Sequence, residues 1–135
     1  MKLEDLNNYP EYPPQEVVEQ FCDLALDEAE HVTTKETLGT LCYLGDKQWH
    51  TYKLPSSELR ARIKAWLIHS GAVDSDENLV DLLVISFCFA LDKTFYKLLL
   101  DRYSDETKWQ FAANIENSPE DDIDPWWSLK KIQKL

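Results

Sequence analysis

Apolar residues recur at intervals of one, three and four positions along much of this chain. That spacing is typical of one face of an amphipathic α-helix. The clearest case is the segment 14–30, whose apolar positions are Val17, Val18, Phe21, Cys22, Ala25 and Ala29. Pro14 suits the first position of such a helix, because the amide hydrogen that proline lacks would have no partner there. The pattern predicts an amphipathic helix over residues 14–30.

The next stretch is less regular. Thr33 or Thr34 is a suitable cap for a short helix over residues 35–44, and Gly45 is expected to end it. Residues 49–54 are predicted to form a loop. A stronger signal follows, since Ser56 or Ser57 can cap a helix that Gly71 would end. The predicted inward face of this helix consists of Leu59, Ile63, Trp66, Leu67 and Ser70.

The segment 79–91 is apolar on nearly all sides, with only Asp81 and Ser86 polar. Such a segment is typical of a central helix covered by its neighbours. A buried strand would show the same composition. We favour a helix, because the run is long and the chain offers few other strands to pair with it.

Two more helices are expected towards the C-terminus. The first brings together Phe95, Leu98, Leu99 and Tyr103, and Ser104 is expected to cap the second. Prolines at positions 119 and 125 then break regular structure and place a loop over residues 116–125. Residues 126–135 are predicted to form a short C-terminal helix.

These elements predict an all-α fold, a compact single-domain bundle of five to six helices spanning residues 1–135. An extended lead-in is expected over residues 1–13, which hold Pro10 and Pro13. The chain has 135 residues, of which 44% are apolar. A chain of this size can bury enough surface to fold without a metal or a disulfide.

Charge narrows the classes of partner. Twenty-five acidic residues against fourteen basic ones give a net charge of -11. Direct binding to nucleic acid or to an anionic membrane is therefore disfavoured, whereas a basic protein is a complementary partner. The plainer interpretation is that acidity keeps the chain soluble.

The acids are unevenly distributed. Residues 1–30 contain nine acids and one base, and residues 116–125 contain five acids and no base. A tryptophan pair follows that loop; we expect Trp126 to anchor the tail and Trp127 to be partly exposed. An exposed indole among carboxylates suits a cationic partner. The candidate partner-binding residues are Glu120, Asp121, Asp122, Asp124, Trp127, Glu19, Asp23 and Asp27.

Motifs for catalysis, metal binding or cofactor binding are not evident in the sequence. His31, His50 and His69 fall on different predicted elements, and the chain contains no glycine-rich phosphate loop. We expect no catalytic residue, metal ligand or cofactor. Asp74 and Asp76 are interpreted as helix-capping residues. The bases Arg60, Arg62 and Lys64 are expected on a solvated face or paired with the acidic first helix.

Three cysteines, an odd number, indicate free thiols in a reducing compartment. The first residues lack the apolar segment of a signal peptide, and the apolar run over residues 82–91 is too short to span a bilayer. A cytoplasmic location is therefore expected.

In size, acidity, helicity and acidic-aromatic surface, the chain resembles bacterial toxin-immunity proteins. The resemblance implies a non-catalytic protein that neutralises a basic toxin by covering it or its active site. Two alternatives stay open. One is a regulatory adaptor or nucleic-acid mimic whose carboxylates imitate phosphates. The other is an enzyme that uses helical Glu or Asp residues with His31 or His69.

Overall fold

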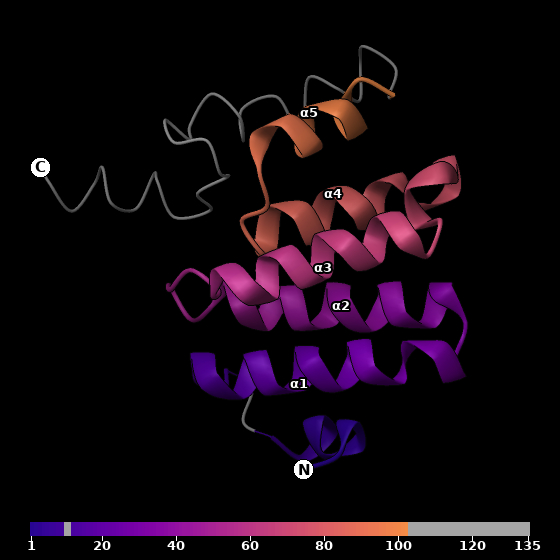
Figure 1. Ribbon diagram of the computed structural model, residues 1–135. Coiled ribbons are helices and arrows are strands. Elements are labelled where there is room, and N and C mark those ends of the chain that lie inside the picture. The colour runs from indigo at the N-terminus through magenta and orange to yellow at the C-terminus, as the bar shows by residue number, and fades with distance from the viewer. Residues whose placement is uncertain (10–11, 103–135) are drawn as a thin grey trace, which may run out of the picture.

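The computed structural model describes residues 1–9 and 12–102, which form helices joined by short turns (Figure 1). The α-helices in this part of the chain are α1 (Gln15–Glu28), α2 (Thr34–Trp49), α3 (Ser57–His69), α4 (Leu79–Cys88) and α5 (Lys93–Leu100). Four 3-10 helices accompany them: η1 (Leu3–Asn8), η2 (Ala29–His31), η3 (Ala72–Asp74) and η4 (Asp76–Asn78). The described residues contain no β-strand, and the predicted all-α class is confirmed.

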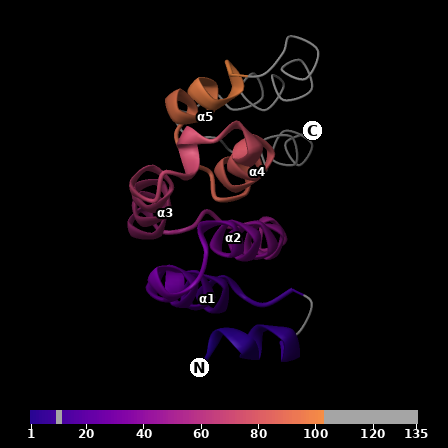
Figure 2. The same ribbon diagram turned by 90° about the vertical axis from the view of Figure 1, so that its right-hand side faces the viewer.

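The helices form a compact stack that follows the chain. From η1 at one end, α1, α2, α4 and α5 succeed one another, and α3 lies beside the stack (Figures 1 and 2). Helix α2 occupies the centre, because it packs against α1 on one side and α4 on the other. Helix α3 contacts α1 and closes one side of the core.

The segment 79–91 is confirmed as a helix, α4, rather than a strand. Most of its residues are buried, and Leu82, Ile85 and Ser86 are inaccessible to solvent, although Val80 is 55% exposed. The Ser86 hydroxyl donates to the carbonyl of Leu82 at 2.7 Å, which satisfies this polar group inside the core. Burial on several sides explains why the segment is apolar nearly all round.

Helix α2 runs straight through Gly45, so the prediction that Gly45 ends a helix at residue 44 is wrong. The glycine serves packing instead. A Cβ atom at position 45 would lie 3.0 Å from Cβ of Cys88 and 3.4 Å from the ring of Phe89. Gly45 therefore allows α2 and α4 to approach closely.

Two of the predicted helix N-caps are confirmed, and a third prediction of this kind is wrong. Thr33 caps α2 by accepting a hydrogen bond from the Glu36 amide at 3.1 Å, and Ser56 caps α3 in the same way. Gly71 follows α3 with a left-handed φ of 79°. The acids before α4 behave differently: the N-cap is Asn78, and Asp76 instead accepts from Arg102. Asp74 and Asp76 are therefore not caps of this helix.

The lead-in is only partly extended. Lys2 and Tyr9 have extended backbone dihedrals, but Leu3–Asn8 between them forms η1. The prolines of this region begin at position 10, so they do not restrict residues 3–8. Leu6 is buried and attaches η1 to the bundle, while the Lys2 amide donates to Asp5 at 2.8 Å.

Leu98 does not share the buried face of α5. The sequence pattern grouped it with Phe95 and Leu99, but Leu98 is 64% exposed, whereas Tyr96 and Leu100 are buried together with Phe95 and Leu99. Asp92 begins the helix by accepting from the Phe95 amide at 2.8 Å. The prediction for Tyr103 and the helix expected from Ser104 lie outside the described residues.

Candidate functional site

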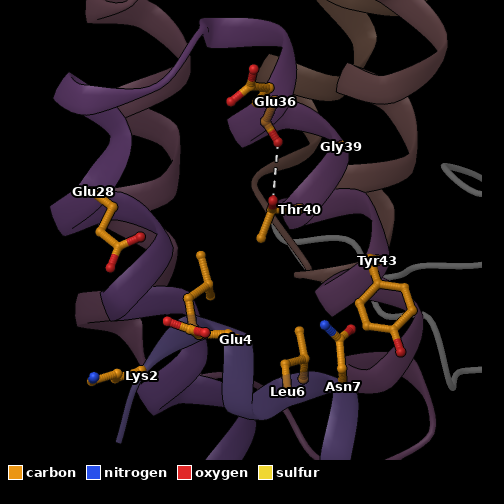
Figure 3. A pocket seen from close by; sticks show the side chains of 10 residues that line it. Lys2, Glu4, Leu6, Asn7, Glu28, Glu36, Gly39, Thr40 and Tyr43 are labelled. Carbon is orange, nitrogen blue, oxygen red and sulfur yellow. Dashed lines mark hydrogen bonds between the residues drawn. The ribbon is translucent and has the colours of Figure 1, made fainter.

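A groove of about 1020 Å³ lies between η1, α1 and α2 (Figure 3). Helix η1 packs against α1, and its residues line the hollow together with residues of α1 and α2. The residues that line it are Lys2, Leu3, Glu4, Leu6, Asn7, Glu28, Glu36, Gly39, Thr40 and Tyr43. These side chains come from three segments distant in sequence, so the groove is a product of the tertiary structure.

The groove is acidic. Glu4 from η1, Glu28 from the end of α1 and Glu36 from the first turn of α2 surround it, and Lys2 is the one base in its lining (Figure 3). All three carboxylates are exposed, and none forms a salt bridge within residues 1–9 and 12–102. Three carboxylates against the one lysine leave the groove lining with a net negative charge, which attracts a cationic partner.

Glu28 is unfavourably placed for stability. It is the last residue of α1, and the last turn of this helix carries no base. A carboxylate at a helix C-terminus opposes the helix dipole, at a cost of about 0.3–1 kcal/mol. Glu36 is in the opposite situation, since it lies in the first turn of α2, where negative charge is favourable.

The floor of the groove is open at Gly39. No atom lies within 4 Å of the position that a Cβ would occupy there. Beside it, the Thr40 hydroxyl donates to the carbonyl of Glu36 at 3.0 Å, drawn as a dashed line in Figure 3. A side chain from a partner can therefore enter at Gly39 without displacing an atom of this chain.

One end of the groove is aromatic. Tyr43 is 48% exposed, and the Lys47 ammonium lies 5.0 Å from the centroid of its ring. The same ammonium lies 5.6 Å from the ring of Tyr12, so Lys47, only 8% exposed, is held between two tyrosines. Cations bind to ring faces through the ring quadrupole.

The acids predicted on the first helix have internal partners. Arg62 of α3 donates to Asp23 at 2.8 Å and to Asp27 at 2.5 Å. The hydrogen bond with Asp27 is the main cause that raises the pKa of Arg62, and Asp23 adds to it. Glu19 accepts from the Ser56 hydroxyl at 2.6 Å and from Gln15 at 3.1 Å. These acids fasten α1 to neighbouring segments.

The other predicted partner-binding residues lie outside the described residues: Glu120, Asp121, Asp122, Asp124 and Trp127, together with the proposed anchor Trp126. The groove acids were not selected from the sequence. The only sequence signal that pointed towards the groove was the excess of nine acids over one base in residues 1–30, which include Glu4 and Glu28. Sequence did not indicate which of those acids would be neutralised.

Arg62 and Lys64, two of the three bases predicted on α3, form salt bridges with acidic side chains. Lys64 donates to Asp92 at 2.6 Å, and Arg60 donates to the carbonyl of Ala90 at 3.4 Å. The pairing expected with the acidic first helix is found for Arg62, whereas Lys64 pairs with the residue that begins α5.

The cysteines are poor nucleophiles. Burial raises the pKa of Cys42 and of Cys88 to about 12 in each case, and it also raises the pKa of Cys22. The nearby Asp81 carboxylate adds to the effect on Cys42. All three thiols are therefore protonated at neutral pH. Within the described part of the chain, no group of three His, Cys, Asp or Glu side chains could hold a metal ion.

The histidines lie on separate elements. His31 ends η2, His69 ends α3, and His50 caps the C-terminus of α2, with its Nδ1 atom 2.8 Å from the carbonyl of Asp46.

Comparison of the chain with protein-family models, curated proteins and solved structures gave no match. In residues 1–9 and 12–102, no helix combines the length and the apolar character needed to cross a bilayer.

Proposed function

We propose that this chain is a non-catalytic binding protein that neutralises a basic protein partner, and that it acts as an immunity protein against a cognate bacterial toxin. The observation that carries the proposal is the groove, whose carboxylates Glu4, Glu28 and Glu36 outnumber its one lysine and form no salt bridge among the described residues. The net charge of -11 adds a long-range attraction for a basic surface.

The groove also offers what a protein partner needs beyond charge. The open floor at Gly39 can admit a side chain, and the exposed ring of Tyr43 supplies apolar area next to the acids. Aromatic residues are enriched at the centres of interfaces because they bury a large area at low entropic cost. Glu28 supports the same conclusion, because its position at the end of α1 does not serve the stability of that helix.

The direct test is capture of the partner from extract of the native cell by immobilised protein, at low and at high salt. A basic protein should be retained at low salt and released as salt rises, because screening weakens exposed charges. If the captured protein is a toxin, stoichiometric addition of this chain should abolish its toxic activity. Capture of no basic protein would overturn the proposal.

Matched variants locate the surface. Changing Glu4, Glu28 and Glu36 together to Gln should slow association with the captured partner by at least about tenfold, since steering by charge dominates encounter rates. The control is Glu58→Gln, Asp74→Asn and Glu77→Gln, which removes the same charge from exposed positions outside the groove. Equal effects of the two triple variants would show that net charge alone acts.

Two further variants complete the test. Gly39→Leu fills the groove floor without changing charge, and it should weaken binding mainly by speeding dissociation. If the predicted loop also contacts the partner, reversing its charge by changing Asp121, Asp122 and Asp124 to Lys should slow association. The same change should leave thermal stability nearly unchanged. Unchanged binding would remove that loop from the interface.

A further inference from the structure

A continuous set of rings extends from the groove to the end of α2. We call it the aromatic cluster; it consists of the rings of Tyr43, Tyr12, His50, Trp49 and Tyr52, and of the Lys47 ammonium, which lies between the rings of Tyr43 and Tyr12. Beyond Lys47, the ring of Tyr12 stacks on His50 with centroids 4.2 Å apart, and His50 meets Trp49 at 5.0 Å. The rings of Trp49 and Tyr52 are 6.1 Å apart. Tyr43 belongs both to this cluster and to the groove lining, so the two surfaces are continuous.

Tyr52 at the far end of the cluster has a strained backbone. Its φ is 57°, in the left-handed region that side chains with a Cβ atom rarely adopt. Glycine would adopt this conformation without the steric penalty. The ring of Tyr52 does not compensate by burial in the core, because the residue is 59% exposed. The tyrosine is thus held in a costly conformation with its ring at the surface.

Hydrogen bonds around Tyr52 keep the turn in place independently of its side chain. Gln48, which is fully buried, donates to the carbonyl of Lys53 at 2.7 Å. The Thr51 hydroxyl donates to the carbonyl of Gln48 at 2.7 Å and accepts from the Lys53 amide at 3.2 Å. Gln15 of α1 anchors the arrangement by donating to Gln48 at 2.9 Å. The turn therefore does not need a tyrosine, and strain of this kind is concentrated at functional positions.

The chemistry of the cluster indicates what Tyr52 binds. Lys47 already lies against the rings of Tyr43 and Tyr12, which shows that tyrosine faces in this cluster accept a cation. The groove joined to this cluster at Tyr43 carries three carboxylates, which attract cationic groups of the partner. Arginine fits best, because its planar guanidinium stacks on aromatic faces and is less strongly hydrated than an ammonium.

We propose that Tyr52 is a contact residue for an arginine side chain of the basic partner, at the end of the aromatic cluster that begins at the acidic groove. This inference rests on the proposed function and names a side chain that the partner presents. The groove would supply attraction of any cation, and Tyr52 would supply preference for arginine over lysine. A charged surface without the ring would attract both residues equally.

The test uses oligo-arginine and oligo-lysine peptides of equal length, titrated against the full chain at low salt. The native protein should bind the arginine peptide about two- to fivefold more tightly than the lysine peptide, as expected for one exposed cation–π contact. Tyr52→Gly should abolish this preference while leaving the melting temperature unchanged or higher, since the left-handed strain is relieved. Tyr52→Phe keeps the ring and should retain most of the preference.

The outcomes separate the two proposals. If both peptides bind the native protein equally and the groove triple variant weakens both, the proposed function stands and the role of Tyr52 falls. If neither peptide binds, attraction of basic chains by the groove is itself refuted. Light scattering on the native protein and on Tyr52→Gly covers a further possibility: a dimer that the variant loses would show that a second copy of the chain covers Tyr52, and would overturn the inference.

Discussion

The guanidinium of Arg62 on α3 donates to the Asp23 carboxylate on α1 across 2.8 Å. Asp27, one turn further along α1, shares the same guanidinium. This relationship divides the acids of the first helix into two groups. Asp23 and Asp27 are compensated by an internal base, whereas Glu28 lines the groove and forms no salt bridge among the described residues. Of these three acids, Glu28 should therefore attract a partner most strongly.

Replacing Asp23 and Asp27 together by Asn should have little effect on partner association and a modest effect on stability. The two side chains are 55% and 63% exposed, and exposed ion pairs contribute about 0.2–1 kcal/mol each. Denaturant unfolding measures the loss of stability, and stopped-flow mixing with the captured partner measures association. A slowing as large as that of the groove triple variant would show that these paired acids steer the partner as well.

Glu28→Lys should stabilise the protein and weaken partner binding. A base at the C-terminus of α1 interacts favourably with the helix dipole, by about 0.3–1 kcal/mol. The same change reverses a charge in the groove. Thermal unfolding and partner titration on one preparation test both effects. Glu77→Lys, at an exposed position outside the groove, is the matched control. A variant that is more stable and still binds normally would exclude Glu28 from the interface.

The two glycines of α2 should respond oppositely to alanine. Gly39→Ala should stabilise by about 0.5–1 kcal/mol, because the methyl meets no atom and alanine favours a helix. Gly45→Ala should destabilise by about 1–3 kcal/mol, because its Cβ would lie 3.0 Å from that of Cys88. Chemical denaturation gives both values. A stabilising Gly45→Ala would show that α2 and α4 can move apart without cost.

Asp92 should contribute stability that is lost in acid. Partial burial acts to raise the pKa of its carboxyl, but hydrogen bonds from Lys64 and from the Phe95 amide outweigh burial and lower the pKa below its usual value. A depressed pKa in the folded state stabilises the protein above the unfolded pKa of about 3.9. This contribution should disappear as pH falls from about 4 through the lower folded pKa.

Asp92→Asn should therefore flatten the decline of stability below about pH 4 and leave the cap of α5 largely intact, since asparagine also caps helices. Asp92→Ala should lose the cap as well, at a cost of about 1 kcal/mol at neutral pH. Unfolding free energies measured from neutral pH down to about pH 2 compare the three proteins. If the unfolding free energy of Asp92→Asn declines below about pH 4 as steeply as that of the native protein, the pH dependence belongs to other carboxyls.

Local signals predicted local structure well. Ser56 was one of two serines expected to cap α3, and its hydroxyl accepts from the Leu59 amide at 3.2 Å. Gly71 was expected after that helix, and its left-handed φ of 79° matches the expectation. Each of these features depends on one residue and its near neighbours along the chain. The expectation for Leu98 was wrong, because α5 buries Tyr96 and Leu100 instead.

Gly45 shows the limit of such reasoning. As a sequence signal it indicates a helix end, yet it lies inside α2 because α4 approaches at that point. The same limit applies to charge. Sequence showed that acids concentrate in residues 1–30, but the distance from Asp23 to Arg62 exists only after α1 and α3 have packed together.

The sequence by itself determined the helical class, the apolar segment that became α4 and the acidic character of the molecule. These properties follow from periodicity, composition and capping, which act over a few residues. Only the tertiary structure decided which acids are neutralised, where the groove opens and why Tyr52 takes a left-handed backbone. Those properties depend on atoms brought together from distant parts of the chain, because Coulomb interactions, packing and hydrogen bonds act through space rather than along the sequence.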